Sequence, residues 1–109
     1  MLEKIIRKNA AGGKGEVILQ PLLTEEQKGT KIGTYAEVTI PAGSSLGLHR
    51  HTGNAESYYI LSGKGLYTDD DKTYEVSAGD ATYCADGHSH GLENTGTTDL
   101  KFMALIINS

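Results

Sequence analysis

Short runs of β-branched and aromatic residues, separated by residues that favour tight turns, constrain the fold of this chain most strongly. The runs are bounded by Gly, Asp, Asn or Ser, and the chain has 14 glycines but only two prolines. No helix of crossover length separates them, which argues against a parallel sheet. We therefore predict an all-β fold, a sandwich or a closed barrel, with strands at residues 16–20, 33–40, 45–51, 56–63, 64–68, 72–76, 79–84, 89–94 and 99–107.

Two connecting segments carry local signals of their own. Residues 22–29 favour a helix of at most about two turns, because Thr24 can act as an N-cap and Glu25 and Glu26 favour the first turn. The three aspartates of TDDDKT, residues 68–73, are interpreted as a solvated hairpin tip. A calcium loop is not expected there, since no glycine and bidentate glutamate follow at EF-hand spacing.

Length, charge and cysteine content exclude several classes of protein. A chain of 109 residues predicts a single domain over residues 1–109, in which residues 1–15 form a flexible or edge-pairing N-terminal segment. The net charge is −4 without a basic stripe, so no nucleic-acid partner is expected. No run approaches the roughly 18 apolar residues of a membrane span, so no membrane partner is expected either. The single Cys84 permits no internal disulfide and is expected to be a small buried hydrophobe, which fits a cytoplasmic protein.

Two of the four histidines lie one residue apart in a predicted strand. Side chains at i and i+2 of a strand share a face, so His49 and His51 point the same way. After the short loop TGNA, Glu56 begins the next strand and can present an oxygen beside them. The same alternation places Tyr58 on the face of Glu56. The hairpin thus predicts three ligands for one ion, with an apolar wall alongside.

This arrangement resembles the first sequence motif of the cupin superfamily. That motif is a glycine, five residues, His-x-His, three or four residues, a glutamate, six residues and a glycine. The sequence matches it without a departure at Gly43, His49, His51, Glu56 and Gly63.

The second cupin motif is matched with one departure. It is a glycine, five residues, Pro-x-Gly, two residues, a histidine, three residues and an asparagine. The matching positions are Gly79, Gly87, His90 and Asn94, and Ala85 stands where proline is expected. The alanine loosens a turn and is not a ligand. Residues 43–94, about half of the chain, form the core of the resemblance.

The resemblance implies a double-stranded β-helix, a jelly-roll barrel, with His49, His51, Glu56 and His90 as ligands of one divalent metal near the barrel mouth. Three imidazoles and a carboxylate suit the transition metals Mn, Fe, Co, Ni and Zn better than Ca or Mg, which prefer oxygen ligands. An octahedral ion would keep two open positions for a substrate and a second small molecule. Zinc could instead be saturated by the four ligands.

Further residues are candidates for a role beside the metal. His88 lies two residues before His90, so it could face the barrel mouth as a proton shuttle or a substrate contact, or lie on the rim. Tyr58, Tyr83 and Met103 could line a pocket or simply belong to the core. His88 and Tyr58 are the candidate catalytic residues.

The two arginines bear on the substrate. Arg50 lies between the two histidines and is expected to face away from the metal, and Arg7 lies in the leading segment. No guanidinium is therefore expected to point inward and grip a carboxylate, which disfavours a small diacid such as oxalate. A neutral ligand, or an anion that coordinates the metal directly, is easier to accommodate.

We expect a small metal-dependent enzyme, an oxygenase, lyase or isomerase that acts on a small organic molecule. The alternative is a non-catalytic module that binds or senses a small ligand such as a sugar. A homodimer is also expected, because small cupins often pair and because a barrel this short is expected to leave apolar edge strands, such as residues 16–20 and 102–107, that need cover.

Overall fold

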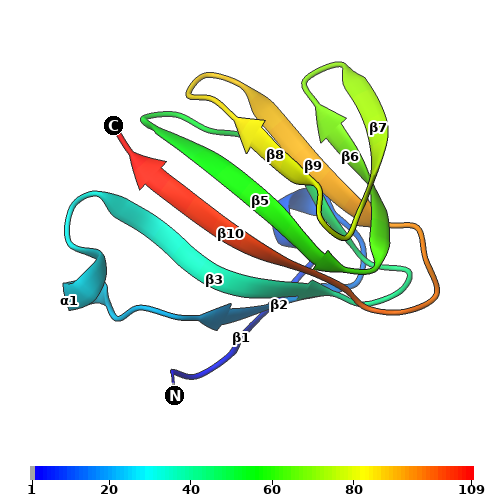
Figure 1. Ribbon diagram of the computed structural model, residues 1–109, viewed down its shortest axis with the longest axis horizontal. Coiled ribbons are helices and arrows are strands. Elements are labelled where there is room, and N and C mark those ends of the chain that lie inside the picture. Colours follow the sequence, from blue (N-terminus) through cyan, green and yellow to red (C-terminus); the bar gives the residue numbers. More distant parts are fainter. Residues whose placement is uncertain (1) are drawn as a thin grey trace.

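The computed structural model describes residues 2–109, which form two antiparallel sheets that face each other (Figure 1). The larger sheet has six strands in the order β1-β2-β3-β10-β5-β8, and the smaller has four in the order β4-β9-β6-β7. The strands are β1 (Ile5–Lys8), β2 (Glu16–Pro21), β3 (Ile32–Ile40), β4 (Ser45–Arg50), β5 (Asn54–Ser62), β6 (Lys64–Asp69), β7 (Lys72–Ser77), β8 (Ala81–Cys84), β9 (Ser89–Asn94) and β10 (Leu100–Asn108).

The all-β prediction is confirmed, and each of the nine predicted runs contains one strand, β2 to β10, with ends that agree within two residues. β1 is not among the nine predicted runs and lies within residues 1–15, the segment expected to be flexible or edge-pairing. It pairs antiparallel with β2 at the edge of the larger sheet, with Ile5 opposite Leu19 and Arg7 opposite Val17. A short 3-10 turn, η1 (Ala10–Gly12), connects it to the rest.

The one segment that favoured a helix is helical. α1 (Glu25–Lys28) begins after Thr24, whose side chain accepts a hydrogen bond from the backbone N–H of Gln27, while the Gln27 side chain accepts one from the backbone N–H of Thr24. This reciprocal capping box satisfies two amides that a single-turn helix would otherwise leave open. Within residues 2–109, no helix combines the length and the apolar character that a membrane span requires.

The hydrophobic core lies between the two sheets. Alternate residues of β3, β5 and β10 point inward, and the Tyr58 and Phe102 rings pack with centroids 4.5 Å apart. Cys84 is buried as predicted. Its burial raises the pKa of the thiol to about 11, so the side chain stays neutral. The largest fully buried side chains are those of Tyr58, Tyr67, Phe102, Ile40, Ile60, Leu92, Leu100 and His90.

The expectation that residues 16–20 and 102–107 form exposed edge strands is wrong. The first run is β2, which lies between β1 and β3, and the second belongs to β10, which lies between β3 and β5. A nearly continuous apolar run suits a strand with neighbours on both sides. Strands β1 and β8 form the edges of this sheet instead.

Gly63 shows why a motif position requires glycine. It makes the turn between β5 and β6 with φ at 87°, a left-handed conformation that side chains disfavour. A Cβ atom at this position would also lie 2.6 Å from the carbonyl oxygen of Asp99. The turn therefore needs a residue without a side chain for two independent reasons.

Candidate metal centre

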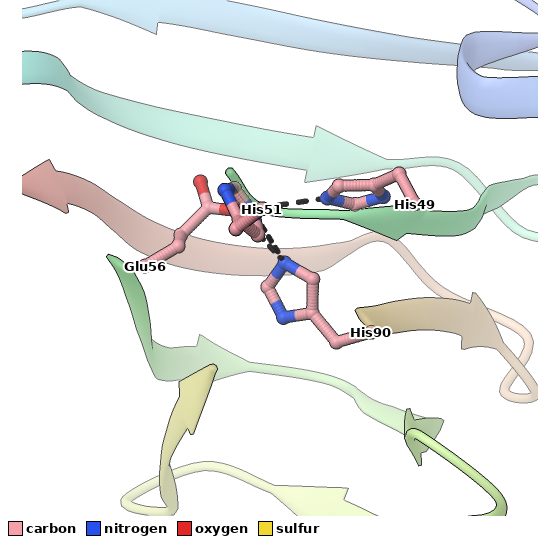
Figure 2. A group of neighbouring side chains, drawn as sticks. All are labelled: His49, His51, Glu56 and His90. Atoms are coloured by element: carbon pink, nitrogen blue, oxygen red, sulfur yellow. Dashed lines mark hydrogen bonds and ion pairs between the residues drawn. The ribbon is translucent and has the colours of Figure 1, made fainter. Parts of the chain in front are cut away.

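The four predicted ligands converge between the two sheets (Figure 2). His49 is the second-to-last residue of β4 and lies directly opposite His90 of β9 in the smaller sheet, while Glu56 reaches across from β5 of the larger sheet. His51 follows β4 in the connection to β5. One ligand atom from each residue lies within 4.8 Å of every other.

The closest approaches all involve the Nε2 atoms of the rings and one oxygen of Glu56. This Oε1 atom lies 2.9 Å from Nε2 of His90, 3.0 Å from Nε2 of His51 and 3.7 Å from Nε2 of His49. The Nε2 atoms of His51 and His90 are 3.0 Å apart. Figure 2 shows the three rings turned so that these atoms face a common centre.

The opposite nitrogen of each ring is held by a neighbour. Nδ1 of His49 donates to the carbonyl oxygen of Gly47 at 2.8 Å, and Nδ1 of His51 donates to Oδ1 of Asn54 at 2.7 Å. Nδ1 of His90 lies 2.8 Å from the hydroxyl oxygen of Tyr67. Because a carbonyl oxygen only accepts hydrogen bonds, His49 and His51 carry their proton on Nδ1 when neutral and turn a bare Nε2 lone pair toward the centre.

This donor set fits a metal ion. The Nε2 lone pairs and the Glu56 oxygen repel one another when no proton lies between them. A cation at the centre attracts all of these groups and so stabilises their convergence. Ligand bonds to transition ions are about 2.0–2.2 Å long, so ligands at right angles lie about 3.0 Å apart. Three of the four closest contacts match that separation. The cluster is thus compatible with one ion, and its three imidazoles and carboxylate suit Mn, Fe, Co, Ni or Zn.

The pKa values of Glu56 and His90 favour the forms that bind a metal, whereas that of His49 is shifted the other way. Although burial alone would raise it, the neighbouring imidazoles of His49 and His90 lower the pKa of Glu56 to about 2, so the carboxylate stays ionised. Burial lowers the pKa of His90, which keeps that ring neutral. Burial also acts to lower the pKa of His49, but the nearby Glu56 carboxylate and the hydrogen bond to the Gly47 carbonyl outweigh it and raise the value.

A pocket of about 270 Å³ opens onto the cluster. It contains His49, His51 and Glu56 in its wall, while His90 lies beneath and is fully buried. Its other walls are mostly apolar and come from η1 and from strands β2, β3, β4, β5 and β10. These lining residues are Ala10, Ala11, Val17, Leu19, Thr34, Val38, Leu46, Tyr58, Phe102, Ala104 and Ile106, and Arg7 of β1 completes the set.

The position of Arg7 corrects the expectation that no guanidinium faces the site. Arg7 lies opposite Val17 in the β1–β2 pair, so both side chains are on the inner face of the sheet, and both line the pocket. The sequence did not indicate which side chains of residues 5–8 face the pocket, because only the pairing of β1 with β2 fixes their direction. With a guanidinium among the lining residues of the pocket, a small diacid is no longer disfavoured. Arg50 is exposed and does not line the pocket, as expected.

Tyr58 lies in the site, whereas the other two pocket candidates do not. Its ring stacks on His90 with centroids 4.8 Å apart, and its hydroxyl is 3.4 Å from Nε2 of that ring. Burial raises the pKa of Tyr58 well above its usual value, so the hydroxyl stays protonated. Tyr83 is 63% exposed, and neither Tyr83 nor Met103 lines the pocket.

His88 lies outside the pocket, on the rim. Its ring donates from Nδ1 to Oδ2 of Asp70 at 2.6 Å, and both side chains are solvent-exposed. The position inside the barrel mouth is incorrect because β9 begins at Ser89, and His88 belongs to the preceding turn, where strand alternation does not apply. Asp70 also accepts a hydrogen bond from the Ser89 amide, so this aspartate of the hairpin tip has a structural role.

Residues that orient the ligands were not identified from the sequence. Asn54 is the second residue before Glu56, and a side-chain acceptor in the loop after His-x-His was an available signal. Tyr67 comes from β6 and the Gly47 carbonyl from the backbone of β4. Neither has a spacing signal, since only the pairing of β6 with β9 brings Tyr67 beneath His90.

Comparisons with known proteins agree with this architecture. The family model for the cupin domain matches residues 36–106. The chain is 48% identical to the oxalate-binding protein of Thermotoga maritima, over 91% of this chain and 82% of that protein. It is 39% identical to an uncharacterised protein of Methanocaldococcus jannaschii, over 82% of this chain and 70% of that protein. The crystal structure of a predicted oxalate decarboxylase from Thermotoga maritima superposes with a TM-score of 0.95 at 44% identity, covering 99% of this chain and 94% of that one. The predicted double-stranded β-helix is confirmed.

Proposed function

Because this chain belongs to the cupin domain family, we propose that it holds one divalent transition metal at His49, His51, Glu56 and His90 and uses that ion to bind a small organic carboxylate. The observation that carries the proposal is the convergence of bare Nε2 lone pairs and an ionised carboxylate at the base of a small pocket. When bound, the ion supplies a Lewis acid with positions open to an anionic ligand.

The size and the walls of the pocket support a small ligand. About 270 Å³ must hold the ion and its ligand, and this volume lies just below the range of about 300–1,000 Å³ of pockets that bind drug-sized molecules, which favours a small organic ligand. Apolar walls from Val17, Leu46 and Phe102 keep water away from the ion and strengthen its attraction for an anion. Oxalate is the first ligand to test, since a relative that is 48% identical is called an oxalate-binding protein.

We favour binding over catalysis. Apart from the metal ligands, the lining residues that could transfer a proton are Tyr58 and Thr34, and burial holds the Tyr58 hydroxyl in its protonated form. Glu56, the one carboxylate among the lining residues that the structure describes, is already committed to the cluster. The pocket walls therefore lack a free acid or base with a pKa near 7, which general acid–base chemistry normally uses.

A metal-dependent lyase is the second candidate. It is favoured by the likeness to a solved structure described as a predicted oxalate decarboxylase. Release of CO₂ from oxalate requires that the remaining carbon take up a proton, and His88, the candidate proton shuttle, lies outside the pocket. Formation of formate from oxalate by the manganese-loaded protein would favour this second candidate over simple binding.

Calorimetry with oxalate tests the proposed function. Protein loaded with Mn²⁺ is expected to bind oxalate at one site per chain, whereas protein stripped of metal by a chelator is expected not to. The Glu56→Gln variant serves as a control that keeps the shape of the site and removes its charge. Equal oxalate binding with and without metal, or no binding by the loaded wild-type protein, would contradict the proposal.

We also propose that the chain forms a homodimer, through the outer face of its six-stranded sheet rather than through an edge strand. Large apolar side chains alternate with inward-facing residues there and remain exposed. Met103 of β10 lies opposite Tyr59 of β5, and Leu105 lies opposite both Tyr35 of β3 and Ser57 of β5. An exposed apolar face of this kind favours a protein interface. Its exposed members are Tyr35, Tyr59, Leu61, Tyr83 and Ile107.

A further inference from the structure

Arg7 is a positively charged group in a pocket whose other charged groups belong to the metal cluster. Within residues 2–109 no carboxylate forms an ion pair with its guanidinium. Glu56, which lines the same pocket, is turned toward the three imidazoles instead. The pocket thus presents an unpaired, partly solvent-exposed guanidinium in the same wall as three ligands of the candidate metal centre.

The strand that carries Arg7 is held by its pairing with β2 and by the turn that follows it. The β1–β2 register sets Arg7 opposite Val17, which is almost completely buried. On the C-terminal side, the chain turns back at η1, where the Asn9 amide donates to the carbonyl of Gly15 at 2.8 Å. These contacts fix the backbone around Arg7 before a ligand arrives, which reduces the entropic cost of binding.

The N-terminal segment is also anchored directly to the strand that carries His49. The Lys14 amide donates to Oγ of Ser45 at 2.9 Å, and the Ser45 amide donates to the Lys14 carbonyl at 2.9 Å. Gly47 lies so close that a Cβ atom there would clash with the carbonyl oxygen of Ala11. The segment therefore forms a fixed wall of the pocket, in which Ala10 and Ala11 are lining residues together with His49 and His51.

From this arrangement we propose that Arg7 selects ligands with two carboxylate groups. This inference rests on the proposed function, in which the ion takes carboxylate oxygens of the ligand. A guanidinium presents paired N–H donors that match the two oxygens of a carboxylate, so Arg7 binds the oxygens that the ion leaves free. A ligand with an uncharged group at its far end leaves the guanidinium without a partner and binds less tightly.

Oxalate and oxamate form a matched pair of probes for this selectivity. They have nearly the same size and shape, but oxamate carries an uncharged amide in place of one carboxylate. Calorimetry on the Mn²⁺-loaded full chain measures the ratio of their dissociation constants in wild-type protein and in Arg7→Gln. Arg50→Gln is the control, because Arg50 is exposed, does not line the pocket and is the other arginine of the chain.

The wild-type protein is expected to bind oxalate more tightly than oxamate by on the order of 10- to 100-fold, the range of a charge-assisted hydrogen bond. Arg7→Gln should bring this ratio close to one, and Arg7→Lys should restore part of it, since lysine keeps the charge but lacks the fork. Arg50→Gln should keep the wild-type ratio. Manganese affinity, measured by chelator competition, should be the same in all four proteins.

Two failures are distinguishable. If the wild-type protein binds oxalate and Arg7→Gln keeps the full preference over oxamate, the assignment of Arg7 is overturned while the proposed function stands. If the loaded wild-type protein binds neither anion, both the proposed function and the role of Arg7 are contradicted. A melting curve of each loaded variant verifies that all four proteins are folded at the temperature of the titration.

Discussion

The Nε2 atoms of His51 and His90 lie 3.0 Å apart, although the Nδ1 proton of His51 is donated to Asn54 and its Nε2 atom is therefore bare. Oε1 of Glu56 lies within 3.0 Å of both nitrogens. Without a cation, a stable arrangement of these groups requires that protons occupy the space between them. Metal binding and proton binding at this cluster therefore compete with each other, and both affect the stability of the folded protein.

Removal of the Glu56 charge should abolish metal stabilisation without weakening the metal-free fold. A ligand at 100 times its dissociation constant stabilises the native state by about 2.7 kcal/mol, which raises the melting temperature of a domain of this size by on the order of 10 °C. In Glu56→Gln the amide group can donate to a bare Nε2 atom, so the metal-free protein should melt at the wild-type temperature or above it. Calorimetric melting with and without Mn²⁺ measures both effects, and an undiminished metal shift in the variant would contradict the ligand assignment.

The hydrogen bond from His51 to Asn54 should matter for metal affinity. Loss of the acceptor in Asn54→Ala frees the ring to rotate and to change tautomer, which is expected to weaken metal binding by about 10- to 100-fold. Asn54→Asp keeps an acceptor at the same place and should retain most of the affinity. Chelator competition measures both variants, and equal losses in the two would show that the site does not depend on this acceptor.

Metal affinity should fall steeply as the medium is acidified below neutral pH. The pKa of Glu56 is about 2, so this carboxylate remains available throughout, and protons compete with the metal only at the imidazoles. The pKa of His49 is raised, so its protonation begins above the usual imidazole value of about 6.5, whereas the lowered pKa of His90 delays its protonation to more acidic solution. Metal content after equilibration between pH 8 and pH 4 measures the profile. Retention of the metal at pH 4 would contradict it.

His88→Ala should leave metal and oxalate binding unchanged, because the His88 ring faces Asp70 on the rim and does not line the pocket. The raised pKa of His88 and the lowered pKa of Asp70 both follow first from the hydrogen bond that joins them, and both side chains are exposed to solvent. The same titrations of Mn²⁺ and oxalate provide the measurement. A tenfold loss of oxalate affinity in His88→Ala would show that His88 takes part in ligand binding.

A charge on the outer face of the six-stranded sheet should disrupt the proposed homodimer. Tyr59→Lys places an ammonium group at the centre of the exposed apolar face, and desolvation of that charge opposes association. Leu48→Lys is the control, because Leu48 is equally exposed but belongs to β4 of the other sheet. Sedimentation velocity at micromolar concentration should give a dimer for the wild-type protein and the control, and a monomer for Tyr59→Lys. A monomeric wild-type protein would exclude the homodimer.

The sequence by itself determined the all-β class, the positions of β2 to β10 and the four residues of the candidate metal centre. The strands and the pairing of His49 with His51 rest on short-range physics, since turn residues mark the ends of strands and an alternation of two places these histidines on one face. Likewise, the cap of α1 at Thr24 is a contact between residues three apart. Each of these depends on spacing along the chain, which a sequence displays directly. His90 was identified through the resemblance to the second cupin motif.

Only the tertiary structure decided which residues surround the ligands. Tyr67 reaches His90 because β6 pairs with β9, and Arg7 faces the pocket because β1 pairs with β2 in a register that sets it opposite Val17. Of the two positions that the sequence left open for His88, the structure decided for the rim, because the strand alternation begins only with β9 at Ser89. Strand pairing and register arise from the burial of whole faces against one another, and a shift of one residue reverses every side chain. Spacing along the chain and the resemblance to the cupin motifs could therefore identify the candidate ligands of the ion but not the walls of the pocket around it.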